Sequence, residues 1–422
     1  MSTLLAINNY YYHRGGSEAI FFGHNRLFES MGWDIVPFAM QHAENLATPW
    51  SEYFVEELEM SGAYSVAQKL ARLPKVIYSF EARRRLDALL RVKRPDIAHA
   101  HNIYHHISPS ILGLLKRRGI PTALTLHDLK LACPAYSMLA HDGVCERCRG
   151  GRIHNVVLNR CIGNSAAMSF VVMLEAMLHR LLGSYSRCVD ALIVPSRFYL
   201  EKFVEWGLPR SHFRYVPNFI DVQRYEPAYT AGRGFAYLGR LTRQKGVATL
   251  IRAAAQVRQP LVVAGTGPEM NALRGLAASL NADVTFTGHI SGQALHDVVR
   301  AARAVVLPSE WYENAPVSLL EAYALGKPVI GARIGGIPEL IRENQTGVCF
   351  GSGDTVSLAA ALEDLHSRPD GEIEDMGRAA RRWLEDEFTL KHYRQRIVAV
   401  YRELGVNLPA SAAFAAESSQ PV

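Results

Sequence analysis

Short apolar runs alternate with longer amphipathic stretches along the whole chain. Runs in the first half predict strands over Leu4–Asn8, Asp96–His101, Thr122–His127 and Ala191–Pro195. Runs in the second half predict strands over Phe235–Gly239, Leu261–Ala264, Val284–Thr287, Ala304–Leu307 and Pro328–Gly331. Buried apolar strands that alternate with amphipathic helices are typical of parallel sheets covered on both faces. The pattern therefore predicts an α/β fold with doubly wound sheets.

The strand rhythm breaks at "YVPNFID", residues 215–221, where proline and asparagine favour a turn. A chain of 422 residues suits two domains, and the rhythm restarts after this turn. Ligands of doubly wound sheets bind at the carboxyl ends of the strands, so we expect two Rossmann-like domains that face one central cleft. The expected parts are an N-terminal domain over 1–212, a second domain over 213–380, a C-terminal helix over 381–405 and a disordered tail over 406–422.

The composition is that of a globular protein, with 49% hydrophobic and 20% charged residues. The first residues do not predict a secretory signal. The longest apolar stretch, 170–182, is interrupted by Glu175, His179 and Arg180 and is shorter than the roughly 20 residues of a membrane span. We therefore expect a cytoplasmic protein whose six cysteines are thiols or metal ligands.

The net charge of +6 is carried by the first half of the chain. Before Glu205 there are 23 Lys and Arg against 17 Asp and Glu, whereas the remainder has 23 of each. Nine of the basic residues lie within Lys69–Arg94. This excess predicts an anionic partner, such as a phospholipid surface or a phosphorylated acceptor, and a solvated basic face is the alternative. We expect no nucleic-acid partner.

The most informative segment is Leu307–Ile341. It predicts a strand end, a loop that contains Glu313, a helix that begins at Pro316 and contains Glu321, and a glycine-rich loop at 335–336. The free N–H groups of a helix N-terminus suit a phosphate. Carboxylates beside it can accept hydrogen bonds from sugar hydroxyls.

The segment Tyr237–Gly246 follows another predicted strand and carries Arg240 and Lys245 on one loop. Fixed cations can neutralise the charge that develops on a diphosphate leaving group without a metal ion. The chain has no pair of aspartates two residues apart, so it lacks the D-x-D pair with which many sugar transferases hold a divalent ion.

Two pairs of glycines and one histidine complete the candidate site. Gly265 and Gly267 follow a strand, and Gly15 and Gly16 precede the first helix, where the backbone can approach a ligand closely. Neither pair completes G-x-G-x-x-G, which argues against a dinucleotide-dependent oxidoreductase. His127 ends a predicted strand and is placed to hydrogen-bond a sugar or an acceptor hydroxyl, unless Asp128 or the backbone satisfies it as a core histidine.

These motifs together resemble the family 4 glycosyltransferases of the GT-B architecture, in particular bacterial members that make polysaccharides. The phrases "GGSE", "PNFID", "GRLTRQKG" and "AGTGPE" occur in the expected order, and Ser309–Gly336 is the most specific part. The resemblance implies a nucleotide-diphosphate sugar donor, retention of anomeric configuration and no metal or other cofactor for catalysis. It also implies that the C-terminal helix crosses back onto the first domain.

By the same resemblance, Arg240 and Lys245 bind the donor diphosphate, Glu313 contacts the donor sugar, Glu321 contacts the ribose, and His127 lies near the reaction centre. Further donor contacts are expected at Gly15, Gly16, Gly265, Gly267, Asn314, Ala315 and Val317. The acceptor is expected to be a glycan or a lipid-linked sugar in surface polysaccharide synthesis. A nucleotide-sugar epimerase of the same fold, which needs no acceptor, is the alternative function.

Residues 131–187 resemble an insertion of some polysaccharide members and contain Cys133, Cys145, Cys148 and Cys161. Cys145 and Cys148 form a C-x-x-C pair, the common half-site of a four-thiolate zinc site. We expect one structural zinc here, and four reduced thiols are the alternative. A zinc-containing interaction module would account for only this short stretch of the chain.

Overall fold

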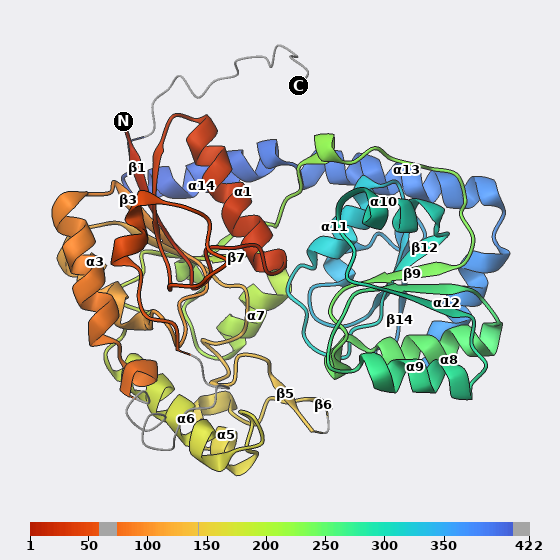
Figure 1. Cartoon of the computed structure of the whole chain (residues 1–422), viewed down its shortest axis with the longest axis horizontal. Helices are drawn as coiled ribbons and strands as arrows, with labels where there is room; N and C mark the ends of the chain where they lie inside the picture. Colours follow the sequence, from red (N-terminus) through yellow and green to blue (C-terminus); the bar gives the residue numbers. More distant parts are fainter. Residues whose placement is uncertain (59–73, 142, 408–422) are drawn as a thin grey trace.

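The computed structural model describes residues 1–58, 74–141 and 143–407, which form two α/β domains (Figure 1). The first domain is built on a six-stranded parallel sheet with the strand order β2-β1-β3-β4-β7-β8. Its strands are β1 (Thr3–Ile7), β2 (Asp34–Phe38), β3 (Ile97–Ala100), β4 (Thr122–Thr125), β7 (Ala191–Val194) and β8 (Phe213–Tyr215). Its helices are α1 (Gly16–Ser30), α3 (Phe80–Val92), α4 (Leu112–Arg117), α5 (Asn155–Leu158), α6 (Ala166–Leu181) and α7 (Arg197–Glu205).

The second domain repeats this plan with a six-stranded parallel sheet of order β11-β10-β9-β12-β13-β14. Its strands are β9 (Phe235–Leu238), β10 (Leu261–Ala264), β11 (Val284–Gly288), β12 (Ala304–Leu307), β13 (Val329–Ala332) and β14 (Gly347–Phe350). Its helices are α8 (Val247–Val257), α9 (Met270–Ser279), α10 (Gly292–Ala301), α11 (Val317–Ala324), α12 (Thr355–Ser367) and α13 (Asp370–Glu387). The expected pair of doubly wound GT-B domains is confirmed.

Some boundaries differ from the sequence expectation. Strand β8 pairs with β7, so residues 213–215 complete the first sheet although the sequence boundary assigned them to the second domain. The strands β2, β8 and β14 were not among the predicted ones. Helix α11 begins at Val317, with Pro316 as its N-cap.

The C-terminal helix expected over 381–405 is two helices. Helix α13 ends at Glu387, and α14 (Leu390–Glu403) begins after a break at Thr389. Figure 1 shows α13 beside the second domain and α14 beside α1 of the first. Tyr393 and Tyr401 of α14 are buried in one cluster with residues of β1 and α1, so α14 is part of the first domain's core. Of the expected tail, residues 408–422 lie outside the described residues.

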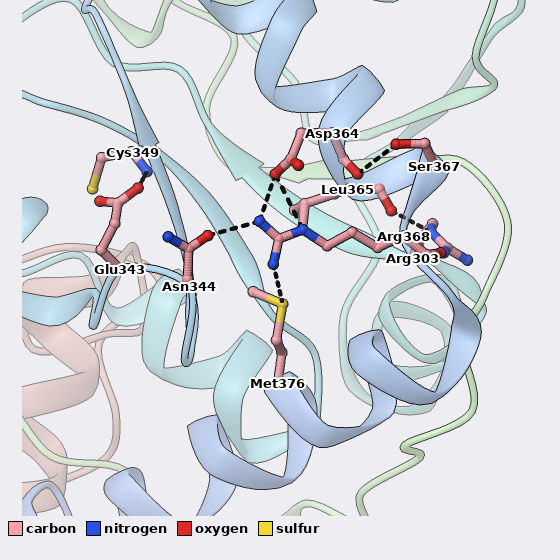
Figure 2. A network of polar contacts seen from close by, with 9 residues as sticks. All are labelled: Arg303, Glu343, Asn344, Cys349, Asp364, Leu365, Ser367, Arg368 and Met376. Atoms are coloured by element: carbon pink, nitrogen blue, oxygen red, sulfur yellow. Dashed lines mark hydrogen bonds and ion pairs between the residues drawn. The ribbon is translucent and has the colours of Figure 1, made fainter.

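A buried arginine fixes the strand that leads to the candidate site. Arg303, directly before β12, donates to the carbonyl oxygen of Leu365 (Figure 2) and to that of Arg368. It also forms an ion pair with Asp370 at 2.7 Å. Arg368 in turn donates to Asn344 at 2.7 Å. This network connects the end of α12 to the start of β12. The start of β12 is the opposite end of this strand from the loop that carries the candidate site.

The insertion over 131–187 forms a short hairpin, β5 (Leu139–Ala140) with β6 (Gly143–Val144), followed by α5 and α6. Helix α6 buries Val171, Val172 and Glu175 on one side. Within the described ranges, no helix combines the length and the hydrophobicity needed to cross a bilayer.

The ring of the linker residue Phe219 packs against Tyr393, with centroids 4.2 Å apart. A Cβ at Gly23 of α1 would lie 2.8 Å from the tip of the same ring. The glycine in mid-helix therefore serves the close approach of the linker to α1.

We predict that Gly23→Ala destabilises the protein although alanine favours helices. Overpacking costs about 1–3 kcal/mol, which exceeds the gain of about 1 kcal/mol in helix propensity. Gly275→Ala in α9 is the matched control, because a Cβ there meets nothing within 4 Å, and it should stabilise. Urea unfolding measures both, and a Gly23→Ala protein at least as stable as the wild type would contradict the packing argument.

Candidate active site

Glu313 lies in the loop between β12 and α11, with its side chain buried. Three donors converge on its Oε1 atom: the Lys245 ammonium at 2.6 Å, the Ser309 hydroxyl at 2.7 Å and the Trp311 indole N–H at 2.8 Å. Burial alone would raise the pKa of the Glu313 carboxyl, but the Lys245 charge and these hydrogen bonds lower it. The carboxylate is ionised and held in place, and none of the three bonds uses its second oxygen, Oε2.

Two glycines shape the backbone around Glu313. Gly335 has a φ of +60°, and a Cβ there would lie 2.4 Å from the Glu313 carbonyl oxygen. A Cβ at Gly336 would lie 1.9 Å from the Asn314 carbonyl oxygen, and its N–H donates to the Glu313 carbonyl at 2.8 Å. The glycine-rich loop after β13 therefore supports the loop that carries the carboxylate.

The basic loop between β9 and α8 brings its two cations to this place. Lys245 forms the ion pair with Glu313, whereas the exposed Arg240 has no ion-pair partner in the described part of the chain. Gly246 has a φ of +68°, and a Cβ there would lie 1.8 Å from the Pro308 carbonyl oxygen. The basic loop thus packs directly on the end of β12.

Gly265 and Gly267 support the basic loop from the other side. A Cβ at Gly265 would lie 1.8 Å from the Gly239 carbonyl oxygen, and one at Gly267 would lie 2.2 Å from that of Leu241. The Leu241 N–H also donates to the Thr266 carbonyl at 2.8 Å. The structure therefore gives this G-x-G a role in positioning the Arg240 loop, and its direct contact with a donor stays a prediction.

The N-termini of α1 and α11 meet at the junction of the two domains. A Cβ at Gly16 would lie 3.5 Å from the side chain of Val317. Neither helix has a side-chain hydrogen bond at its N-cap, which is Gly15 in α1 and Pro316 in α11. Two helix N-termini with uncapped N–H groups and positive dipole ends are suited to a phosphate group.

Glu321 lies on α11, about one turn from its start, and the Tyr225 hydroxyl approaches its Oε1 at 3.5 Å. Burial raises the pKa of the Glu321 carboxyl, and the Tyr225 hydroxyl opposes this only in part. The two glutamates of the motif thus differ in environment, because only Glu313 has a cationic partner at ion-pair distance.

Asn314 and Ala315, which we expected to contact the donor, instead join the two domains. The Asn314 side chain accepts from the Ser196 hydroxyl at 2.8 Å and donates to the Leu126 carbonyl at 3.0 Å. The Ala315 carbonyl accepts from the Asn218 amide at 2.8 Å. Their backbone N–H groups are not used in these bonds, so contact with a donor through them stays a prediction.

His127 lies two residues beyond the end of β4, next to the Leu126 that Asn314 contacts. Its Nε2 hydrogen-bonds Nδ1 of His101 at 2.8 Å, and the two rings are stacked. Burial lowers the pKa of His127 to about 4, so the ring is neutral at neutral pH. Asp128 does not satisfy it, because that carboxylate accepts from the Lys130 N–H instead.

A chain of buried groups lies behind His127; the sequence offered His99 and His101 as weaker candidates and missed His24 and Tyr401. His99 hydrogen-bonds the hydroxyls of Tyr401 and Thr125, each at 2.7 Å, and its ring stacks on His101. His24 reaches Tyr401 at 3.0 Å. The only available signal was H-x-H at the end of a strand, since Tyr401 comes from α14, about 300 residues away in the sequence.

The four insertion cysteines are free thiols. Cys148 interacts electrostatically with the other three, and burial raises its pKa to about 12. The Cys133 sulfur accepts backbone hydrogen bonds from Ala135 and Met138. Across residues 1–58, 74–141 and 143–407 there is no group of three or more His, Cys, Asp or Glu side chains that could hold a metal ion, so the structure offers the expected zinc no ligand set.

Two family models match consecutive parts of the chain. Residues 15–224 match Glycosyltransferase Family 4, and residues 225–383 match Glycosyl transferases group 1. The chain is a glycosyltransferase of family 4.

Relatives and solved structures agree with this assignment. A glycogen synthase from Mycobacterium tuberculosis is 27% identical over 321 residues, which are 73% of this glycosyltransferase and 69% of that protein. The sucrose-phosphate synthase structure from Thermosynechococcus elongatus has a TM-score of 0.69 at 20% identity and covers 96% of this chain and 99% of that one. Anabaena HepE in complex with UDP-glucose has a TM-score of 0.65 at 14% identity over 96% and 100% of the two chains.

We predict that the glycosyltransferase loses stability in mild acid because His24 must stay neutral in the fold. Burial lowers its pKa from 6.5 to about 3, so its contribution is complete above pH 6.5 and is lost as the pH falls from 6.5 toward 3. Between pH 7 and pH 5 one such histidine accounts for about 2 kcal/mol of unfolding free energy.

Urea titrations at the two pH values test this expectation. His24→Gln should reduce the difference in unfolding free energy between pH 7 and pH 5 by about 2 kcal/mol. His289→Gln, at an exposed position of the second domain, should leave the difference as it is. An undiminished difference in His24→Gln would show that His24 is not the group that binds the proton.

Proposed function

We propose that this glycosyltransferase moves a sugar from a nucleotide-diphosphate donor to a glycan or lipid-linked acceptor, without a metal ion and with retention of anomeric configuration. The observation that carries the proposal is the buried ion pair of Lys245 with Glu313, beside the meeting point of two uncapped helix N-termini. This arrangement places cations and N–H groups for a diphosphate next to a carboxylate for sugar hydroxyls.

In the proposed reaction, the bond between the sugar C1 and the diphosphate oxygen breaks, and its electron pair goes to the diphosphate. The oxygen of an acceptor hydroxyl forms the new bond to C1, and the proton of that hydroxyl passes to the departing diphosphate. Arg240, Lys245 and the N-termini of α1 and α11 neutralise that developing charge, and fixed charges of this kind act without reorganisation. Oε2 of Glu313 accepts a hydrogen bond from the donor sugar, and Glu321 binds the ribose. Retention follows from the resemblance of the motifs to the retaining family.

Support for the donor class comes from two sides. The sequence lacks the D-x-D pair and supplies Arg240 and Lys245 instead. Anabaena HepE, whose fold this chain shares, has been solved with UDP-glucose. The relatives and structures described above are named as synthases or as sugar-nucleotide complexes, and none is named as an epimerase.

We predict that Lys245→Ala lowers kcat about 10²–10³-fold with EDTA present, because one preorganised charge stabiliser is lost. Ligand-induced thermal shifts with UDP-, GDP- and ADP-sugars first identify the donor, and the activity assay then uses that donor. Arg252→Ala, an exposed cation on α8, is the matched control and should retain full activity.

The cationic mechanism would be refuted if the wild-type protein required magnesium and the Lys245→Ala protein were as active as the wild type. Incubation of the donor without acceptor separates the alternative, since an epimerase would convert the nucleotide sugar to its epimer under that condition. Anomeric analysis of the product by NMR tests retention.

We also infer that the first domain contacts an anionic membrane through α3, α4 and α6. Several cations of the basic segment are neutralised: Lys75, Arg91 and Lys93 form ion pairs, while Lys69 and Arg72 lie outside the described residues. The contact therefore rests on fewer residues than the sequence count suggested.

The remaining surface combines charge with exposed apolar side chains. Phe80 is 74% exposed beside the exposed Arg84 and Arg117, and Leu181 at the end of α6 is also 74% exposed. The Tyr78 ring contacts both Phe80 and His179 of α6, so the two helices share this surface. Figure 1 shows α3 on the side of the first domain that faces away from the second, and α6 at the lower end of the first domain.

We predict that the protein co-sediments with anionic vesicles and not with neutral ones, and that 1 M salt abolishes binding because the Debye length falls to about 3 Å. Arg84→Glu/Arg117→Glu should weaken binding by more than about tenfold, since each interfacial cation contributes about 1 kcal/mol. Phe80→Ser tests the contribution of the exposed apolar side chain to binding. Its control is Val356→Ser, at a position that is 72% exposed in the second domain. Equal binding by the charge-reversed protein would place the contact elsewhere.

A further inference from the structure

Both sequence neighbours of Glu313 are bonded to the first domain. Asn314 joins that domain through its side chain, as described above. Tyr312, on the other side, donates its hydroxyl to Oε1 of Glu146 at 2.9 Å, and its carbonyl oxygen accepts from the Tyr199 hydroxyl at 3.2 Å. The loop that presents the Glu313 carboxylate is therefore held between two contacts with the opposite domain.

Glu146 belongs to the insertion and follows the β5–β6 hairpin. Its Oε1 also accepts from the Lys202 ammonium of α7 at 2.9 Å, and Glu205 pairs with the same ammonium at 2.9 Å. Burial acts to raise the pKa of the Glu146 carboxyl, but the hydrogen bonds from Lys202 and Tyr312 lower it. Burial and the bond to Glu146 raise the pKa of Tyr312 to about 12, so the hydroxyl keeps its proton and donates to a carboxylate.

The Tyr312 ring is packed as well as hydrogen-bonded. The Phe198 ring of α7 lies with its centroid 4.8 Å from that of Tyr312. The buried Lys202 ammonium lies 5.3 Å from the centre of the Tyr312 ring, where a cation is attracted by an aromatic face. Tyr312 is thus fixed at its hydroxyl, its ring and its carbonyl, and all of these contacts come from the first domain.

The insertion also reaches the basic loop of the second domain. The Arg243 guanidinium donates to the carbonyl oxygen of His141, which follows β5, at 3.1 Å. Arg243 lies between Arg240 and Lys245 in the sequence. Figure 1 shows the β5–β6 hairpin extending from the first domain toward the second. The insertion therefore contacts both of the loops that supply the proposed donor site.

We propose that Glu146 is a positioning residue for the donor sugar, and that the insertion completes the donor site of the second domain from across the domain junction. Glu146 acts through Tyr312 on the adjacent Glu313, whose Oε2 accepts from the sugar in the proposed function. The nucleotide is held by other groups, the basic loop and Glu321. Loss of the Glu146 contact therefore weakens recognition of the sugar more than recognition of the nucleotide.

The inference rests on the proposed donor and adds the residue that couples the insertion to it. The test compares each nucleotide sugar with its nucleotide diphosphate by calorimetric titration of the full-length protein. The probes are UDP-glucose with UDP, GDP-mannose with GDP, and ADP-glucose with ADP. For the pair that binds, the affinity for the nucleotide sugar divided by that for the nucleotide diphosphate is the sugar ratio.

Tyr312→Phe and Glu146→Ala should each lower the sugar ratio about 5- to 10-fold, as expected for the loss of one hydrogen bond to a charged group. Their affinity for the nucleotide diphosphate should stay that of the wild type. The double variant should fall no further than either single variant, because both substitutions remove the same bond.

Two further variants separate positioning from a general loss of structure. Glu146→Gln keeps an oxygen that can accept from the Tyr312 hydroxyl, so it should restore the sugar ratio. The matched control is Glu205→Ala, which removes the other carboxylate on Lys202 and should leave the sugar ratio unchanged.

Hydrogen exchange followed by mass spectrometry tests the contact without a donor. Residues 308–316 should exchange faster in Tyr312→Phe and Glu146→Ala than in the wild type and Glu205→Ala, because the loop opens more easily once the bond is lost. Equal exchange, or an unchanged sugar ratio in a protein that binds the donor, would overturn the positioning role alone. A wild type that binds none of the nucleotide sugars would overturn the proposed donor, and the role of Glu146 with it, even if exchange confirmed the contact.

Discussion

The arrangement of the site depends on one buried carboxylate. An ionised Glu313 is costly to bury unless donors compensate it, and Lys245, Ser309 and Trp311 meet at a single oxygen to do so. This requirement links two loops of the second domain, because Lys245 comes from the end of β9 and Glu313 from the end of β12. Removal of Lys245 would leave Glu313 with an uncompensated charge and would also take a cation from the site. The charge balance of the site and its shape therefore depend on the same contact.

Much of the fold was predictable because its signals are local. The strands β10 and β12 appear in the sequence as four-residue apolar runs, and the structure places them over the same residues. Glu313 in a loop and Glu321 in the next helix were likewise read from residue order. The end of α13 at Glu387 was not predictable, because residues 381–405 have a continuous helical pattern. The break at Thr389 is set by the crossing of the chain to the first domain.

What the sequence could not provide is pairing between distant residues. The sequence offered Asn314 as a donor contact, yet its side chain satisfies Ser196 and Leu126 of the other domain. It offered Gly265 and Gly267 as donor contacts and gave no sign that both pack against the backbone of the Arg240 loop. His101 could not be preferred over His99 until the structure placed it 2.8 Å from His127. In each case the residue type was informative, and the partner was decided by tertiary packing.

The return of α14 to the first domain means that the chain passes between the domains twice, and the two passages are bonded to each other. The Ile220 N–H donates to the Phe388 carbonyl at 2.9 Å, and Ile220 also forms a β-bridge with Thr389. Two parallel straps joined in this way act as a single hinge, which permits rotation about one axis and resists twisting and separation. A rotation about this hinge would carry Glu313 and Lys245 together along one arc past the first helix, and the junction of the two domains would widen as a wedge from the hinge outward.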